Sequence, residues 1–142
     1  MQTRVVVGHP WDVQADVLAL PIPSDDALPA PVAEVDRRLD GAITAYRTVG
    51  ELRGKAWSSA MLQGRETGAP WILAMGVGEA GAFDRLTAVR LGGAIERRLT
   101  DRVVTRLAVV LPQALLGSLD TTAAVELVAR GVVEGSAEPG AI

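Results

Sequence analysis

The residues with the clearest potential for chemistry are three glycines, Gly76, Gly78 and Gly81, which follow an apolar run. They spell G-x-G-x-x-G, the pattern by which a dinucleotide-binding loop brings its backbone close to a pyrophosphate at a helix N-terminus. In such a site the glycines open the helix, and an acidic residue at the end of the next strand holds the ribose. Here the predicted helix cap is Asp84, three residues after Gly81, and the next strand ends in "VVLPQA" without an acid. The glycines are therefore expected to lie in a loop before the helix and to turn the chain sharply.

Other side chains offer little for catalysis. The sequence contains one histidine, His9, and no cysteine, so it has no thiolate nucleophile and no Cys-ligated metal. His9 has no second histidine with which to share a metal, and we interpret it as a loop residue. The strings H-E-x-x-H, G-x-S-x-G and Walker A are absent. Ser58 and Ser59 lack an evident base and are predicted to be polar positions of a strand.

Charged residues cluster in two places. Six aspartates lie among the first 40 residues: Asp12, Asp16, Asp25, Asp26, Asp36 and Asp40. A pair of carboxylates can hold a hard metal ion, but Asp25 and Asp26 fall in a Pro-rich loop that is typical of turns. Asp36 and Asp40 are predicted on the exposed side of a short helix. Arginines at 97, 98 and 102 stand near a helix C-terminus, where the dipole favours cations. We predict no metal site and no cofactor.

Composition excludes two classes of partner. A net charge of -3 does not suit nucleic acid, whose phosphates require a basic surface, and 4% aromatic residues offer few stacking platforms. No apolar run reaches the roughly 18 residues that a membrane helix needs. The length of 142 residues predicts one domain over 1–142, with 136–142 as a frayed tail. We expect a soluble, cytoplasmic protein.

Apolar periodicity predicts alternating strands and helices. Strands are expected at 3–8, 15–23, 57–64, 70–78 and 103–112. Helices are expected from Pro31 to a stop at Gly41, over about 43–49, from the cap Asp84 to about Thr100, and after the cap Asp120. The spacing of 57–64 and 70–78 is that of an antiparallel hairpin, whereas the order of the strands cannot be read. The alternation predicts an α/β layer fold with helices on both faces of a mixed sheet.

Two helices carry a further prediction each. The helix after Asp84 has an inward apolar stripe made of Ala88, Leu91, Gly92, Ile95 and Leu99. In the last helix Val125, Val128 and Val132 are expected to face inward, with an ion pair between Glu126 and Arg130, four residues apart.

Short glycine-based motifs follow one another in a recognisable order. They are Gly41-Ala42-Ile43, Gly54-Lys55, Gly76-Val77-Gly78 and Gly92-Gly93-Ala94, followed by Glu134-Gly135 near the end of the last helix. Together they resemble the N-terminal domain of the leucyl aminopeptidases, the zinc cytosol aminopeptidases, from about Ala15 to Ser136. The resemblance implies a three-layer, macrodomain-like sandwich. It also implies that the zinc ligands and catalytic residues belong to a C-terminal domain whose signatures are not in this chain, so no catalytic residue is carried over.

Two functions compete on this basis. The first is a non-catalytic assembly or regulatory domain of leucyl aminopeptidase type, free-standing or cut from a longer aminopeptidase. Its partner would be a second copy or an aminopeptidase catalytic domain. The alternative is a macrodomain-like binder of ADP-ribose or a related nucleotide, with a crevice at the carboxyl ends of the strands. The candidate crevice residues are Ser24, Asp25, Gly76, Gly78 and Gly81. Against it, "LALPIPSDD" offers few amide groups to a ribose.

Overall fold

The computed structural model describes residues 8–24, 27–52 and 56–137. Its centre is one four-stranded mixed sheet in the order β2-β3-β1-β4. The strands are β1 (Val17–Pro23), β2 (Ser59–Gln63), β3 (Trp71–Gly78) and β4 (Leu107–Val109). β1 runs parallel to both β3 and β4, and β2 runs antiparallel to β3. The predicted hairpin pairing is thus confirmed.

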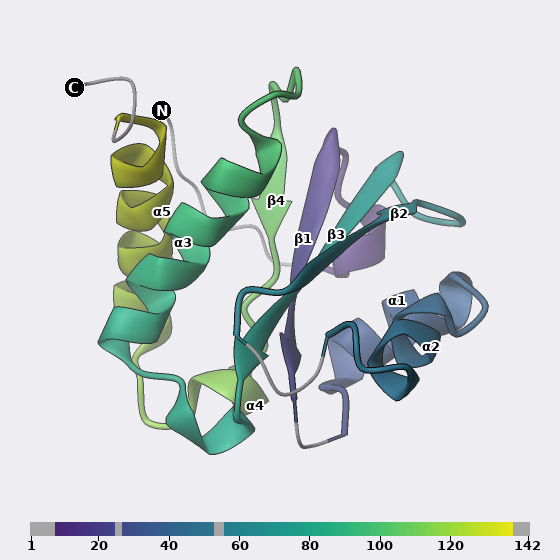
Figure 1. Ribbon diagram of the computed structural model, residues 1–142, viewed down its shortest axis with the longest axis horizontal. Coiled ribbons are helices and arrows are strands. Elements are labelled where there is room, and N and C mark those ends of the chain that lie inside the picture. Colours follow the sequence, from purple (N-terminus) through teal and green to yellow (C-terminus); the bar gives the residue numbers. More distant parts are fainter. Residues whose placement is uncertain (1–7, 25–26, 53–55, 138–142) are drawn as a thin grey trace.

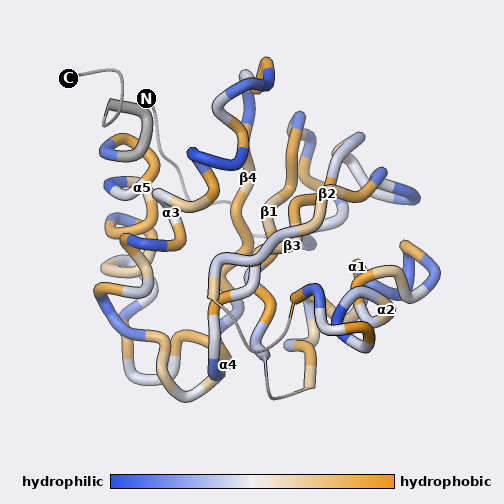
Figure 2. The backbone as a smooth tube through the Cα atoms, in the orientation of Figure 1, coloured by the Kyte–Doolittle hydropathy of each residue, from blue (hydrophilic) through white to orange (hydrophobic). Residues whose placement is uncertain are grey.

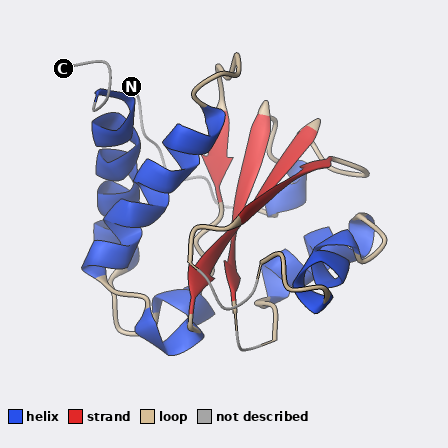
Figure 3. Ribbon diagram, viewed as in Figure 1, coloured by secondary structure: helices blue, strands red, loops and turns tan. Residues whose placement is uncertain are grey.

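Helices cover both faces of this sheet, as Figures 1 and 3 show. One face carries α1 (Ala30–Arg38) and α2 (Ala42–Thr48), and the other carries α3 (Arg85–Leu99) and α5 (Thr121–Ala137). Short pieces connect them: η1 (Pro10–Asp12), η2 (Ala80–Ala82) and α4 (Gln113–Leu116). None of these three pieces has a counterpart in the sequence prediction. The predicted α/β three-layer sandwich with a mixed sheet is confirmed.

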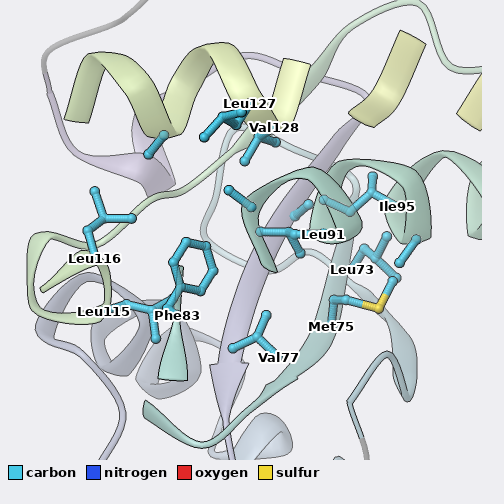
Figure 4. Close-up of a cluster of buried hydrophobic side chains, with 14 of the residues drawn as sticks. Leu73, Met75, Val77, Phe83, Leu91, Ile95, Leu115, Leu116, Leu127 and Val128 are labelled. Carbon is cyan, nitrogen blue, oxygen red and sulfur yellow. The ribbon is translucent and has the colours of Figure 1, made fainter. Parts of the chain in front are cut away.

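The two faces of the sheet carry two separate cores. In β3, Leu73, Met75 and Val77 point toward α3 and α5, whereas Ile72 and Ala74 point toward α1 and α2. Figure 4 shows the first core, in which Leu91 and Ile95 of α3 meet the strand side chains. Every residue of β1 is buried, as expected of a strand covered on both faces. Figure 2 shows this pattern as an apolar centre with polar outer helix faces.

The predicted apolar stripes hold in both long helices. All five stripe residues of α3 are buried, and in α5 Val128 and Val132 are buried while Val125 is partly so. The predicted ion pair of α5 is wrong: the Arg130 Nε lies 3.0 Å from a carboxylate oxygen of Glu134. Glu126 and Glu134 each lie one helical turn from Arg130, and the guanidinium of Arg130 pairs with Glu134, on the C-terminal side. The same helix continues to Ala137 and so includes the start of the predicted tail.

Strand β4 is much shorter than the predicted span 103–112, for two reasons. At its start, the Asp16 carboxylate accepts hydrogen bonds from the amides of Thr105 and Arg106 and holds that stretch as a loop. At its end, the partner strand β1 offers no further backbone N–H groups to β4. Val17 N donates to Arg106 O and Val110 N donates to Ala19 O, so the odd-numbered residues of β1 face β4.

The next odd-numbered residues of β1 are Pro21 and Pro23, which have no N–H. Pairing along this side of β1 therefore ends after Ala19. Beyond β4 the chain continues through α4 toward α5. The strand predicted at 3–8 falls almost wholly outside the described residues.

Candidate functional site

The predicted crevice lies where the parallel strands β1 and β3 end. Pro23 pairs with Gly78, and the Ser24 amide donates to the Gly78 carbonyl oxygen at 2.9 Å. Ser24 and Gly78 are therefore brought together as the sequence predicted. Gly81 lies exposed in η2, and Asp25 lies outside the described residues.

The glycines are not one loop. Gly76 is a strand residue whose amide donates to Ser58 O and whose carbonyl accepts from Trp57 N, each at 2.7 Å. Gly78 ends β3 with φ +84, a left-handed conformation that suits glycine. The expectation that all three glycines lie in a loop is wrong for Gly76 and Gly78, which belong to the strand that was also expected over 70–78 and is confirmed as β3. Only Gly81 lies beyond the strand, before the helix cap.

Hydrogen bonding leaves this crevice few free backbone donors. The amides of Ser24 and Gly76 are both used between strands, and Asp84, after the glycines, accepts from the Thr87 amide at 2.9 Å as the cap of α3. An anion site at a helix N-terminus needs open amides. The geometry is that of a strand end turning into a capped helix.

Asp36 is the largest departure from the sequence prediction. It was expected on an exposed helix face, but it is buried, with 7% of its surface exposed. Its Oδ1 accepts from the Ile43 amide at 2.8 Å and from the Thr44 amide at 3.3 Å, and its Oδ2 accepts from the Thr44 hydroxyl. The chain folds back after α1, so this carboxylate satisfies the first amides of α2. Asp40 is exposed, as predicted.

Two more acids of this region serve the framework. Hydrogen bonds from the Arg106 and Thr105 amides lower the pKa of Asp16 below its ordinary value. Glu34 accepts hydrogen bonds from Arg37 and Arg38, and these bonds lower the pKa of Glu34 to about 2. Glu34 lies on α1 beside both arginines, so this shift reports a helix-surface network and not a catalytic group.

A stacked cluster near the start of the described chain was not predicted. The rings of His9 and Trp11 stack with centroids 4.5 Å apart and planes 9° apart. The Arg38 guanidinium lies 5.0 Å from the centre of the Trp11 ring and donates to the Glu66 carbonyl at 2.6 Å. His9 is a loop residue, as predicted, and it stacks on Trp11, whose ring is in turn covered by Arg38 of α1. No local sequence pattern reveals this cluster.

A shallow cavity of about 270 Å³ lies beside the edge strand β2. It is lined by Leu39, Asp40, Ala42, Leu62, Gln63 and Arg65. At its rim, a guanidinium nitrogen of Arg65 lies 3.7 Å from an Asp40 carboxylate oxygen.

The described part of the chain carries neither a metal-ligand cluster nor a membrane-spanning helix. Within it, no three His, Cys, Asp or Glu side chains gather as metal ligands do. None of its helices has the length and apolar character needed to cross a lipid bilayer.

Fold and site together define a class of protein: an α/β sandwich domain in which Asp16, Glu34, Asp36 and Asp84 bind partners within its own framework. Comparison with known proteins gives the family. The sequence model described as the cytosol aminopeptidase family, N-terminal domain, matches residues 19–138, and the chain belongs to this family.

Curated relatives agree with this assignment. The chain is 36% identical over 115 residues to a probable cytosol aminopeptidase of Solibacter usitatus (strain Ellin6076). It is 31% identical over 114 residues to a probable cytosol aminopeptidase of Xylella fastidiosa (strain M12). Each alignment covers 80% of this chain but 23% of the relative, so the chain spans about a quarter of the length of these proteins.

Proposed function

We propose that this chain is a non-catalytic assembly or regulatory domain of leucyl aminopeptidase type. The observation that carries the proposal is the use of its carboxylates. Asp36 and Asp84 cap helices, Asp16 holds the start of β4, and Glu34 is bound by two arginines. A metal-dependent hydrolytic site needs carboxylates that converge on the metal or on its water, whereas these four point to separate backbone, threonine or arginine partners.

The family match supports the same proposal. It falls on the N-terminal domain of the cytosol aminopeptidases, and the alignments cover 23% of relatives that are named probable cytosol aminopeptidases. Peptidase activity would then reside in a catalytic domain with which this one associates, in the same chain or another. The relatives' name also supports a cytoplasmic location for this protein.

Two measurements on the purified 142-residue chain test the proposal. Hydrolysis of leucine p-nitroanilide is assayed with added zinc or manganese, and we expect no activity above the metal alone. Light scattering over a concentration series, with and without a family catalytic domain, measures assembly, and we expect self-association or a complex. Metal-dependent hydrolysis would refute the non-catalytic role, and a strict monomer that ignores the catalytic domain would refute the assembly role.

The nucleotide-binding alternative receives less support from the crevice. The Ser24 and Gly76 amides are already hydrogen-bonded between strands, and "LALPIPSDD" brings few amide side chains to the strand ends. Calorimetry with ADP-ribose tests it directly: saturable heat would revive the alternative, and its absence together with an unchanged melting temperature would exclude it.

A further inference from the structure

The outer edge of β2 presents unpaired backbone groups. Gly64 N donates to Pro70 O, and Gly76 N donates to Ser58 O, so the even-numbered residues of this stretch face β3. In an antiparallel ladder the alternate residues face the other way. The N–H and C=O groups of Ser59, Met61 and Gln63 therefore point outward from the sheet, where the described part of the chain places no further strand.

This edge lacks the protection that monomeric proteins give to exposed strands. Charged residues, prolines and bulges are the usual means of blocking such an edge. The five residues of β2 read Ser-Ala-Met-Leu-Gln and include no charge and no proline, and their register with β3 is continuous. The edge is thus suited to accept an added strand.

A cation stands over one end of the edge, on the α3 face. Arg98 of α3 is half-buried, and its Nε donates to Ser59 Oγ at 3.1 Å. Of the described carboxylates, none forms an ion pair with it; the four ion pairs involve other arginines. A partly buried guanidinium has five donors in a planar fork, which suits a carboxylate.

The shallow cavity stands beside the other end of β2, on the opposite face. Leu62 and Leu39, which line it, belong to the core under α1 and α2. Leu62 is three residues from Ser59, and positions three apart on a strand lie on opposite faces. An added strand that places one side chain toward Arg98 would place the side chain three positions away toward the cavity.

We propose that the β2 edge is a docking site for an extended peptide segment of a partner protein. The segment pairs with Ser59, Met61 and Gln63 through its backbone, binds Arg98 through an acidic side chain, and places an apolar side chain, three positions from the acid, in the cavity. This inference is independent of the assembly role, which another surface can serve.

Charge favours such a segment over a second copy of β2. In an antiparallel pairing of two copies centred on Met61, Gln63 of one copy lies opposite Ser59 of the other. The strand brings no carboxylate to Arg98, and the first charged residue that follows it is Arg65. Self-pairing would therefore bring no counter-ion to Arg98.

The test uses short capped peptides of threonine and valine that carry one leucine and one glutamate. In two probes the leucine and the glutamate are three positions apart, with leucine first in one probe and glutamate first in the other. In the control probe they are two positions apart, so both side chains lie on the same face of the strand. We expect one of the two probes with three-position spacing to shift the amide resonances of Ser59, Met61 and Gln63 saturably. This probe should bind about tenfold more tightly than the control probe, because it gains one charge-assisted contact.

Matched variants of the full chain separate the contacts. Arg98→Gln should weaken binding about tenfold by removing the counter-ion, while Arg97→Gln, on the same helix but exposed, should not. Gln63→Pro removes one outward N–H and should weaken binding, while Gln63→Ala keeps it. Thermal melts confirm that each variant is folded.

Three results would overturn the proposal: no saturable binding of any probe, equal binding by the spacing control, or undiminished binding by folded Arg98→Gln and Gln63→Pro. Concentration-dependent dimerisation that Gln63→Pro abolishes would assign the edge to a second copy instead.

Discussion

Gly92 of α3 and Gly131 of α5 are in direct backbone contact. A Cβ added to Gly92 would lie 3.0 Å from the Gly131 Cα and 2.1 Å from the Val128 carbonyl oxygen, and one added to Gly131 would lie 2.0 Å from the Val89 carbonyl oxygen. The two helices thus meet along a seam that has room only for hydrogen atoms. This seam lets α3 and α5 pack as a single layer against the sheet.

We predict that Gly92→Ala or Gly131→Ala lowers the free energy of unfolding by about 1–3 kcal/mol, the range of overpacking. The helices must separate, because the obstructing atoms are backbone. Urea denaturation measures the change. Gly93→Ala is the matched control: its Cβ would first meet the movable tip of Arg97 at 3.1 Å. Since alanine favours helix over glycine by about 0.8–1.0 kcal/mol, it should be neutral or stabilising. Equal losses at all three glycines would contradict the seam.

Asp36→Ala should lower the free energy of unfolding by about 1–3 kcal/mol, since it leaves buried donors of α2 without an acceptor. The donors are the amides of Ile43 and Thr44 and the Thr44 hydroxyl. Chemical denaturation gives the magnitude, and amide exchange should show faster opening of α2 than of α3. Asp101→Ala, in the exposed loop after α3, serves as the control and should change little. Equal losses of stability in Asp36→Ala and Asp101→Ala, or equal amide exchange in α2 and α3, would argue against capping by Asp36.

Asp16 should make stability depend on pH in the acid range. Its folded pKa lies below the ordinary 3.8 because the Arg106 and Thr105 amides bind the charged form. A group with a lowered folded pKa stabilises the fold above its unfolded pKa, and this contribution is lost as pH falls through the folded pKa. Melting temperatures of wild type and Asp16→Asn, compared from neutral pH to below 3.8, should converge at the acid end. Parallel curves over the whole range would refute the role of the Asp16 charge.

Gly78→Ala should destabilise the domain by about 1–2 kcal/mol, the cost of a left-handed conformation for a residue with a Cβ. The space itself is open, with the nearest atom 3.9 Å away, so the cost comes from φ +84 alone. Gly81→Ala is the control, since it has no neighbour within 4 Å and no positive φ, and thermal melts should show almost no change. A larger effect at Gly81 than at Gly78 would mean that the glycine motif serves something other than this turn.

Sequence patterns predicted the parts of this fold that depend on neighbours along the chain. The stripe from Ala88 to Leu99 and the caps Asp84 and Asp120 follow from helical periodicity and local hydrogen bonding, and both caps are used. The role of Asp36 could not be predicted in this way. Its acceptor function depends on how the turn after α1 folds back, and at helical spacing Asp36 looks like an ordinary surface residue.

The same distinction applies to the candidate site. The meeting of Ser24 and Gly78 was predictable because the carboxyl ends of parallel strands share one edge of a sheet. The shortening of β4 was not, because it results from contacts with a distant segment: Asp16, about 90 residues away in sequence, binds two amides of the loop before β4, and the prolines of β1 end the pairing after it. Strand order is likewise set by contacts between distant segments.

The prolines of β1 limit how far strands can pair along the side of β1 that faces β4. Pro21 and Pro23 have no donor on the side that faces β4, so no strand can extend the ladder there beyond Ala19. Prolines usually occupy edge strands, but these two lie in β1, an inner strand of the sheet. Strand addition is blocked along this half of β1, and of the two outer strands of the described sheet β2, with five uncharged residues, offers a longer edge than β4, with three.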